Sequence, residues 1–464
     1  MKIEVVNPIE CRISKNFLPI IKPCLTYTGV FYVKVPIHGT DRTRMDRRTY
    51  PKDCIIDKDQ DHAWFLRGHL DRVKTHLDSK KINYTVSGIE ELHVEPKPFK
   101  LPGITFRPDQ LELMQAAVNH KEQNGVIIAP TGTGKTILQL GIRSAFPQYR
   151  CLILAQTIDL VQQIVGECEK FGFNAQQIGG GKKFEGDFTE NTVVSTIQSF
   201  QKIPIELYMT EFPLLLVDEA HHISNFTGRY AKVLRNLISS IKLGFTATLP
   251  TEEEAQMALE GYIGPVIGEQ TINEAAELEI LAVPTVKLLK TEYSQRLHDI
   301  RKYQAVYEEG IVNSRERNEL IVNTILECKK KGEICLIFVN RIEHGNNLVD
   351  LFKRIGKTYV PFVQGEMKGE ERLNIKNSLI SGKRKIAIAT TAWKEGINIP
   401  SLNVIFNGGG GKDDLGVLQT IGRGLRRTND KDTVVIYDIF DPSHHFLVSH
   451  FGQRITLYME NEWL

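Results

Sequence analysis

The segment Ala129-Pro130-Thr131-Gly132-Thr133-Gly134-Lys135-Thr136 has the residue types and spacing of a phosphate-binding loop. It follows the apolar run 125–128 and leads into residues 137–140, which can continue as a helix. Glycines let the backbone curl so that successive N–H groups point at anionic oxygens. Lys135 would then reach the β- and γ-phosphates of a nucleotide, and the Thr136 hydroxyl would bind Mg²⁺. The alternative is a Gly/Thr-rich turn, since Ala129 replaces the usual first glycine.

An acidic pair follows about eighty residues later, in Leu216-Val217-Asp218-Glu219-Ala220-His221-His222. It stands at the carboxyl end of an expected strand, which is where parallel sheets bind ligands. We expect Asp218 to hold Mg²⁺, directly or through water, and Glu219 to orient the water that attacks the γ-phosphate. An acidic pair is unremarkable alone, but after a phosphate loop it indicates nucleotide hydrolysis.

These side chains need parallel strands to position them, and from Phe106 onward strand and helix patterns alternate. The first set of expected strands is 125–129, 151–155, 192–195, 214–217 and 243–246. A helix over 251–259 and a connecting region with Pro265 and Pro284 follow. The second set is 334–340, 358–363, 385–390, 403–407 and 433–439. Two parallel sheets, each covered on both faces, would form two lobes facing a shared cleft.

The first hundred residues indicate a small α+β domain before the lobes. Its helix is expected from Trp64 through Leu77, and the basic segment Arg42–Arg48 is either a solvated loop or a phosphate-gripping edge. Three prolines between 95 and 103 predict a linker. The predicted domains are therefore 1–100, an accessory DNA-binding domain, 101–270, the ATP-binding lobe, and 271–464, the second lobe.

Composition excludes several classes of protein. The 464 residues are 41% hydrophobic and 25% charged, without an apolar run or leader suited to a membrane or to secretion, so a cytoplasmic location is expected. Seven scattered cysteines argue against a zinc site and a disulfide framework, and indicate buried or idle thiols. The net charge of +2 requires local basic patches to hold any polyanion.

The remaining motifs resemble those of superfamily 2 helicases of the DEAH-box type, from Phe106 to about Tyr458. The matching segments before and within the first lobe are 106–110, 154–163, 179–181, 195–199 and Phe245-Thr246-Ala247-Thr248. In the second lobe they are 336–340, 389–400 and Gln419-Thr420-Ile421-Gly422-Arg423-Gly424-Leu425-Arg426-Arg427. The resemblance implies two tandem RecA-like parallel-sheet lobes, an α/β fold, with an ATP site that uses Mg²⁺.

The resemblance also implies roles for individual residues. ATP would be bound by Arg107, Gln110, Thr131, Gly132, Thr133, Gly134, Lys135, Thr136, Gly396 and Asn398, although Asn398 stands where many relatives have aspartate. Catalysis would use Lys135, Asp218, Glu219, Gln419, Arg423 and Arg426, with Thr136 and Asp218 on the metal. Nucleic-acid backbone would be held by Gln156, Thr157, Gly179, Gly180, Thr196 and Thr390, several of which are equally suited to capping helices.

The end of the chain narrows the resemblance to the branch of XPB-type repair helicases and phage UvsW-type branch-migration helicases. His450, Arg454 and Tyr458 fall at a spacing of four, on one face of a helix that docks on the lobe. The implied activity is ATP-driven remodelling of branched DNA in recombination, repair and replication by a monomer, in the host cytoplasm if a phage encodes it. The alternatives are an RNA helicase, a duplex translocase without strand separation and a nucleotide-gated clamp. The turn Asn407–Asp414 is expected to be a surface loop.

Overall fold

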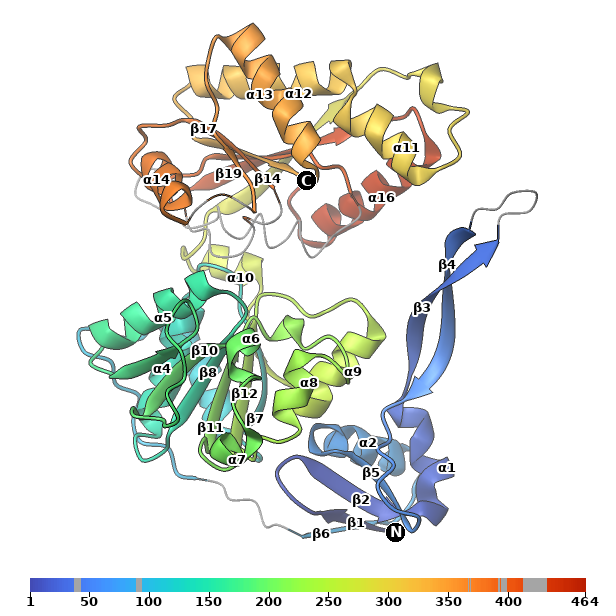
Figure 1. Cartoon of the computed structure of the whole chain (residues 1–464), viewed down its shortest axis with the longest axis vertical. Coiled ribbons are helices and arrows are strands. Elements are labelled where there is room, and N and C mark those ends of the chain that lie inside the picture. Colours follow the sequence, from blue (N-terminus) through green and yellow to red (C-terminus); the bar gives the residue numbers. More distant parts are fainter. Residues whose placement is uncertain are drawn as a thin grey trace. The chain divides into compact units, whose positions relative to one another are not determined.

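The structure, a computed structural model, describes residues 1–36, 43–88, 94–365, 367, 369–390, 393, 399–411 and 432–464. The chain forms two compact units: residues 1–129 with 134–269, and residues 270–464 with 130–133. The first unit contains an N-terminal domain and a seven-stranded parallel sheet, which we call the first lobe, and the second contains a six-stranded parallel sheet, the second lobe (Figure 1). The predicted fold class, two RecA-like lobes with a small N-terminal domain, is confirmed.

The N-terminal domain is built on a mixed sheet of order β5-β2-β1-β6. Its elements are β1 (Lys2–Val5), β2 (Glu10–Ser14), η1 (Lys15–Phe17), α1 (Leu18–Ile21), η2 (Lys22–Leu25), β5 (His62–Leu66), η3 (Arg67–His69), α2 (Leu70–Ser79) and β6 (Thr85–Gly88). The expected helix start at Trp64 is wrong, because Trp64 lies in β5 opposite Arg12 of β2. The helical spacing begins only at Leu70, which is buried together with Val73 and Leu77.

A separate two-stranded antiparallel ribbon consists of β3 (Thr26–Pro36) and β4 (Thr43–Asp53). Its register runs from Thr26 opposite Asp53 to Pro36 opposite Thr43. The loop expected over Arg42–Arg48 is therefore wrong from Thr43 onward, since pairing with β3 makes this stretch a strand. Arg42 lies outside the described residues.

The first lobe has the strand order β13-β7-β12-β11-β8-β10-β9, with parallel neighbours throughout. The strands are β7 (Asn124–Ile128), β8 (Cys151–Ala155), β9 (Ala175–Ile178), β10 (Thr192–Thr196), β11 (Leu214–Asp218), β12 (Ile241–Thr246) and β13 (Val266–Glu269). The helices are α3 (Pro108–Asn119), α4 (Lys135–Ala145), α5 (Ile158–Lys170), α6 (Ile197–Phe200), α7 (Ile205–Tyr208), η4 (Ala220–His222), α8 (Arg229–Leu234) and α9 (Glu253–Tyr262). Apolar side chains of α3, α4 and α5 form one core, and those of α6, α8 and α9 share another with the N-terminal domain.

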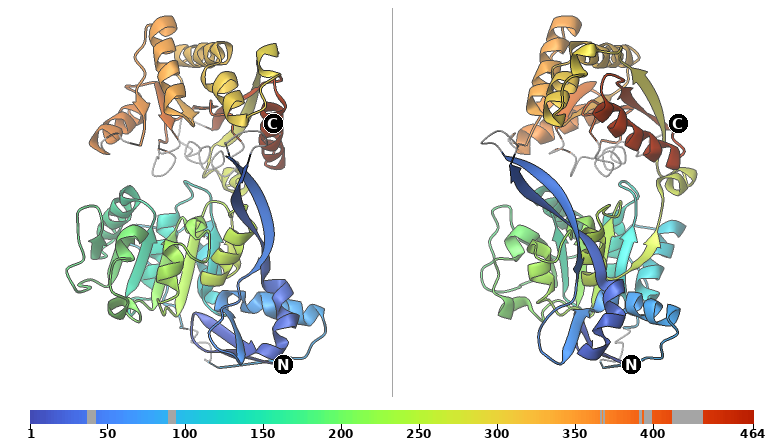
Figure 2. Two further views of the ribbon diagram at one scale, coloured as in Figure 1. Left: turned by 45° about the vertical axis from the view of Figure 1, so that its right-hand side comes forward. Right: turned by 90° about the vertical axis from the view of Figure 1, so that its right-hand side faces the viewer.

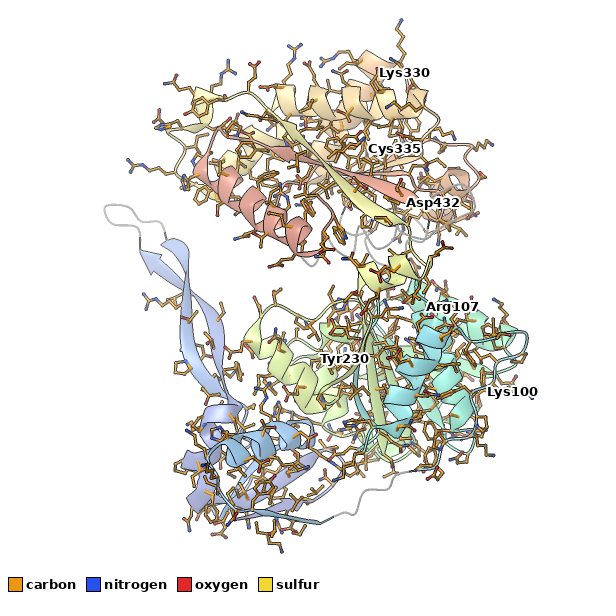
Figure 3. The ribbon with its side chains drawn as sticks, turned by 180° about the vertical axis from the view of Figure 1, so that it is seen from behind. Lys100, Arg107, Tyr230, Lys330, Cys335 and Asp432 are labelled. Atoms are coloured by element: carbon orange, nitrogen blue, oxygen red, sulfur yellow. The ribbon has the colours of Figure 1, made fainter. Side chains whose placement is uncertain are left out.

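The second lobe has the order β14-β19-β18-β15-β17-β16, also parallel. Its strands are β14 (Val283–Lys290), β15 (Cys335–Val339), β16 (Phe362–Val363), β17 (Ile386–Thr390), β18 (Val404–Asn407) and β19 (Thr433–Phe440). Its helices are α10 (Ile272–Glu277), η5 (Gln295–Leu297), α11 (Tyr303–Tyr307), the π-helix η6 (Glu308–Val312), α12 (Arg315–Lys330), α13 (Ile342–Gly356), α14 (Gly369–Ile380) and α16 (His445–Glu460). Figures 2 and 3 show the lobe from other directions, with Cys335 marking the start of β15.

The region expected to be a mere connection carries strands instead. Residues 266–269 form β13, an edge of the first sheet, and residues 283–290 form β14, an edge of the second. Pro284 fits in β14 because an edge strand pairs on one side only. A residue without an N–H group costs no hydrogen bond between strands on the unpaired side. The strand expected over 358–363 is shortened to Phe362–Val363.

The cysteines are present as free thiols, as their scattered positions in the sequence indicate. All seven cysteines are free, and all except Cys24 are buried. Among the described residues, no helix is long and apolar enough to cross a bilayer.

Candidate active site and nucleic-acid interface

The phosphate loop connects the buried strand β7 to helix α4. Gly132 and Gly134 have φ values of 99° and 102°, a left-handed conformation that glycine adopts without steric cost. The Thr133 hydroxyl donates 2.8 Å to the carbonyl of Pro130, which fixes the turn, and Lys135 Nζ donates 3.2 Å to the carbonyl of Ala129. The lysine thus lies back along the loop, with its charge beside the start of the helix.

Gln110, the expected adenine-recognising residue, lies against this loop. Its Oε1 accepts 3.2 Å from the backbone N–H of Arg107, and a Cβ on Gly134 would lie 2.9 Å from its Nε2. Any side chain at position 134 would therefore displace Gln110 as well as strain the turn. Arg107, labelled in Figure 3, pairs through two nitrogens with Asp109 at 3.0 and 2.9 Å.

The acidic pair stands at the end of β11, as predicted, and both side chains are 7% exposed. Gln139 of α4 donates 2.8 Å from Nε2 to Oδ1 of Asp218. Burial raises the pKa of Asp218 to about 6; the neighbouring Glu219 adds to the rise, and the Lys135 ammonium opposes it. The structure therefore brings Lys135, Asp218 and Glu219 into one electrostatic group, and it adds Gln139.

Gln139 is a site residue that was not predicted from the sequence, although a signal was present. Lys135 and Gln139 are four residues apart on α4, so they share a helix face. A polar residue one helical turn after the lysine of the loop therefore faces the same site. The carboxylate to which Gln139 donates belongs to Asp218 at the end of β11.

A second missed connection runs from the acidic pair to the Thr246-Ala247-Thr248 segment. Nδ1 of His221 lies 3.0 Å from Oγ1 of Thr246 and 3.5 Å from Oε2 of Glu219. The Thr246 hydroxyl donates its single hydrogen to the carbonyl of Thr248 at 2.7 Å, so His221 is the donor to Thr246. The imidazole of His221 therefore lies beside Glu219 and is hydrogen-bonded to the strand end that leads to α9.

The expected nucleic-acid residues of the first lobe gather at one edge, because β8, β10 and β9 are neighbouring parallel strands. Gln156 follows β8, while Thr157 and Thr196 cap α5 and α6 by accepting from Leu160 N and Ser199 N. Gly179 and Gly180 follow β9 with φ values of 111° and 65°. A Cβ on Gly179 would lie 2.9 Å from Oγ of Ser199, so this glycine and the cap of α6 touch.

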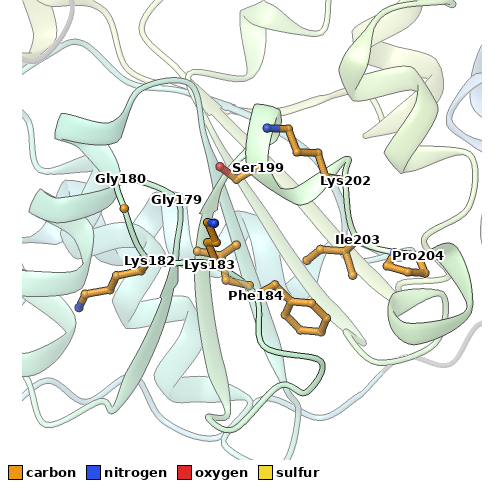
Figure 4. A pocket seen from close by; sticks show the side chains of 11 residues that line it. Gly179, Gly180, Lys182, Lys183, Phe184, Ser199, Lys202, Ile203 and Pro204 are labelled. Atoms are coloured by element: carbon orange, nitrogen blue, oxygen red, sulfur yellow. The ribbon is translucent and has the colours of Figure 1, made fainter.

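A hollow of about 520 Å³ opens beside these glycines, as Figure 4 shows. Its lining includes Ser199 of the motif segment 195–199 and adds four side chains outside the motif segments: Lys182, Lys183, Phe184 and Lys202. Three ammonium groups around a glycine turn form a local basic patch on a chain of nearly zero net charge. The run Gly179-Gly180-Gly181-Lys182-Lys183 carried that signal in the sequence.

In the second lobe, Thr390 ends β17, is 8% exposed, and has no hydrogen-bond partner for Oγ1 among the described residues. Gly396, Asn398, Gln419, Arg423 and Arg426 lie outside the described residues. Their assignments stay predictions.

The described part of the turn Asn407–Asp414, which was expected to be a surface loop, has its glycines buried at 408, 409 and 410, while residues 412–414 lie outside the described residues. The Tyr307 hydroxyl donates 2.7 Å to the carbonyl of Gly409, and a Cβ on Gly409 would lie 2.7 Å from Nδ2 of Asn340. Side chains would clash on this turn, so its glycines serve close packing rather than mobility.

The C-terminal helix α16 fixes the same turn from its other side. Arg454 donates to both carboxylate oxygens of Asp438 at 2.7 and 2.9 Å, and to the carbonyl of Gly411 at 2.7 Å. Tyr458 donates 2.8 Å to Asp438, and Asn407 donates 3.3 Å to the same carboxylate. The predicted docking face of α16 is thus a buried polar network centred on Asp438.

Comparisons with known proteins agree with this architecture. Residues 103–251 match the family of the type III restriction enzyme res subunit, and residues 281–428 match the helicase conserved C-terminal domain. The DNA 3'-5' translocase XPB2 of Sulfurisphaera tokodaii is 28% identical over 385 residues, which cover 75% of this chain and 85% of that protein. The ATP-dependent DNA helicase uvsW of Enterobacteria phage T4 is 25% identical over 334 residues, which cover 68% of this chain and 65% of the phage protein.

The fold is shared with a solved nucleic-acid enzyme. The ATP-dependent Type ISP restriction-modification enzyme LlaBIII bound to DNA aligns with a TM-score of 0.59 and 15% identity, over 83% of this chain and 32% of that one. With two family matches that between them span both lobes, and a phosphate loop facing an acidic pair, the chain belongs to the superfamily 2 helicases and is an ATP-dependent helicase or translocase.

Proposed function

We propose that this chain is an ATP-dependent DNA helicase or translocase that acts on branched DNA, such as Holliday junctions and forks, in recombination, repair and replication. Support for DNA comes from the similarity to XPB2, named as a DNA translocase, and to uvsW, named as a DNA helicase. The chain spans just under two thirds of the phage protein, so the activity of that whole protein is extended to this chain only as a proposal.

The residues of the first lobe fit ATP with Mg²⁺. Left-handed glycines at 132 and 134 leave backbone N–H groups for phosphate oxygens, and Lys135 supplies a positive charge beside them. Thr136 and Asp218 would hold the metal, since hydroxyl and carboxylate oxygens are the ligands that Mg²⁺ prefers. Bound ATP supplies a phosphoryl group whose transfer to water drives the cycle. Glu219 would orient that water.

The second lobe would complete the reaction through residues outside the described ranges. Gln419 would place the water, Arg423 and Arg426 would stabilise the charge on the γ-phosphate, and Gly396 and Asn398 would contact the nucleotide. A guanidinium presents several donors and stays protonated, and such an arginine raises the rate by roughly 10³–10⁵. Hydrolysis would then depend on closure of the two lobes.

DNA would be held through phosphate and sugar rather than base edges, which permits movement along any sequence. The expected contacts are Gln156, Thr157, Gly179, Gly180, Thr196 and Thr390, to which the lysines of the hollow add charge. The accessory domain would contact the branched substrate, and the protein would act as a monomer in the cytoplasm.

The observation that carries the proposal is the group formed by Lys135 and Gln139 of α4 with Asp218 and Glu219 at the end of β11. The test compares ATP hydrolysis by the purified chain with duplex DNA, a four-way junction and structured RNA as stimulators, each at saturating concentration. We expect branched DNA to stimulate most. Stronger stimulation by RNA than by any DNA would identify an RNA helicase, and absence of stimulation would identify a clamp.

A further inference from the structure

The N-terminal domain is joined to the first lobe by buried polar contacts. Nε2 of His69, which is fully buried, donates 2.8 Å to the carbonyl of Met257 in α9. Arg67 pairs with Glu122 at 3.3 Å, with side chains 9% and 12% exposed. The two parts also share one apolar core, so they form a single body.

The contact with α9 is close enough to exclude side chains. A Cβ on Gly68 would lie 1.9 Å from the carbonyl oxygen of Glu260 and 2.7 Å from that of Gly261. Backbone therefore packs on backbone, and Lys242 of β12 adds a 2.9 Å bond from Nζ to the carbonyl of Pro8. The domain cannot slide along α9 without losing these contacts.

The base of the β3–β4 ribbon is tied to the first turn of the same helix. Oε2 of Glu253 accepts 2.8 Å from the N–H of Thr28, and this backbone bond lowers the pKa of the carboxyl group, so Glu253 accepts as a carboxylate. Oε1 of Glu254 accepts 3.3 Å from the hydroxyl of Tyr27 and lies 3.6 Å from Nζ of Lys52. Tyr27 and Lys52 are cross-strand partners, so both strands are held.

Beyond its base the ribbon has only its own two strands, since no third strand pairs with either within the described ranges. Each strand has 11 residues, a length of roughly 35 Å. An isolated two-stranded ribbon is marginally stable in water, so such an extension is explained by a partner rather than by the fold. Figure 2 shows the ribbon standing out from the small sheet of its own domain.

The composition of the ribbon indicates a polyanionic partner. The two strands of the ribbon contain five Lys or Arg and two Asp, in a chain whose net charge is only +2. On β4, Arg48, Thr49 and Tyr50 are exposed. A two-stranded ribbon fits the major groove of duplex DNA, and its basic residues would neutralise phosphates on either side.

We propose that the β3–β4 ribbon is a duplex-binding arm that α9 holds rigidly on the first lobe, so that it engages the groove of the double-stranded part of a branched substrate. This inference rests on the proposed function. The helix α9, which holds the arm, follows the Thr246-Ala247-Thr248 segment, and His221, which lies beside Glu219, is hydrogen-bonded to Thr246. The ATP site and the arm would thus move together.

The test shortens the arm and leaves its base intact. Val30 and Thr49 are cross-strand partners, so replacing residues 31–48 by Asn-Gly gives a short hairpin that keeps Tyr27, Thr28 and Lys52. A full-length variant, Arg44→Gln with Arg47→Gln and Arg48→Gln, removes charge alone. Binding to a four-way junction, a linear duplex and a single strand is measured by fluorescence anisotropy at several salt concentrations, beside ATP hydrolysis stimulated by the single strand.

We expect both variants to bind junction and duplex at least roughly tenfold more weakly, with a salt slope smaller by about 2–3, because each lost phosphate contact removes about 0.9. Single-strand binding and the hydrolysis it stimulates should stay within about twofold of the parent. Parental duplex affinity and slope in the shortened protein would overturn the proposal, as would an equal loss on the single strand. If the parent itself shows no stimulated hydrolysis, the proposed function fails, while the duplex binding comparison still tests the arm.

Discussion

Gln139 donates a hydrogen bond of 2.8 Å to Asp218, and this bond joins the helix of the phosphate loop to the strand of the acidic pair. Both side chains are buried, and Lys135 lies one helical turn before Gln139. Asp218 is thus positioned by a neutral amide, while its charge is opposed by burial and by Glu219. The site holds a carboxylate where the fold alone would favour a neutral group.

The first prediction is that Asp218→Asn stabilises the protein while it abolishes hydrolysis. The pKa of Asp218 is raised to about 6, so its contribution to stability is fully present below pH 3.8 and is lost as the pH rises through about 6. At pH 8, without nucleotide, the amide should raise the free energy of unfolding by on the order of 2 kcal/mol. Urea denaturation measures this, with the exposed Asp159→Asn as control. Lower stability in Asp218→Asn would contradict the account.

The second prediction separates nucleotide binding from turnover. Glu219→Gln keeps shape and hydrogen-bonding capacity but loses the carboxylate that would orient water, so kcat should fall roughly hundredfold or more with ATP affinity retained. Lys135→Ala removes the charge beside the phosphates and should abolish hydrolysis. Steady-state hydrolysis and binding of a fluorescent nucleotide measure the two effects. Parental kcat in Glu219→Gln would show that another group orients the water.

The third prediction concerns the buried glycine turn at 408–410. The chain continues from this turn into residues 412–431, which include the predicted catalytic residues Gln419, Arg423 and Arg426. Tyr307→Phe removes the donor to the carbonyl of Gly409, and we expect kcat for ATP to fall roughly tenfold with little change in KM, a loss within the range of one buried hydrogen bond. Tyr437→Phe is the matched control in the same lobe, because its hydroxyl accepts from Sγ of Cys328 at 4.0 Å and lies outside the network around the turn. Equal effects of both variants on kcat would mean that the turn has no special role.

The fourth prediction is a loss of stability in mild acid through His344. Burial lowers the pKa of this imidazole to about 3, and its Nε2 lies 2.8 Å from Oδ1 of Asn318. The unfolded chain takes up a proton near pH 6.5 while the folded chain does not, so stability is present above pH 6.5 and falls as the pH drops toward 3. Between pH 6.5 and 5.5 the loss should be about 1 kcal/mol.

Comparison of the parent with His344→Gln isolates this group from others that titrate in the same range. Thermal or urea denaturation at several pH values should give a flatter dependence in the variant. An identical dependence in both proteins would assign the acid sensitivity elsewhere.

The lobes and part of the site could be predicted because their signals are local. Five strands of the first lobe follow from apolar runs, and Asp218 follows from its place at the end of one. The strand β14 was not predicted because it contains Pro284. Proline is tolerated there because β14 is an edge strand beside β19, and the local sequence does not show which strands will be edges. Trp64 fitted a helical spacing by coincidence, and pairing with β2 decided otherwise.

Contacts between distant segments could not be predicted in the same way. Gln139 meets Asp218 only because α4 and β11 are adjacent, and the burial of Gly409 depends on Tyr307 and Asn340. The joining of the N-terminal domain to α9 requires His69 to meet a backbone carbonyl far along the chain. Arg423 and Arg426 stay predictions from the motif.

The most direct measurement is ATP-driven processing of a synthetic Holliday junction, compared with a simple flapped duplex of the same length, by the parent and by Lys135→Ala. The account predicts that the parent converts the junction faster than the flap, only with ATP and Mg²⁺, and that Lys135→Ala converts neither. ATP-independent conversion, or a junction left intact while ATP is hydrolysed, would contradict it.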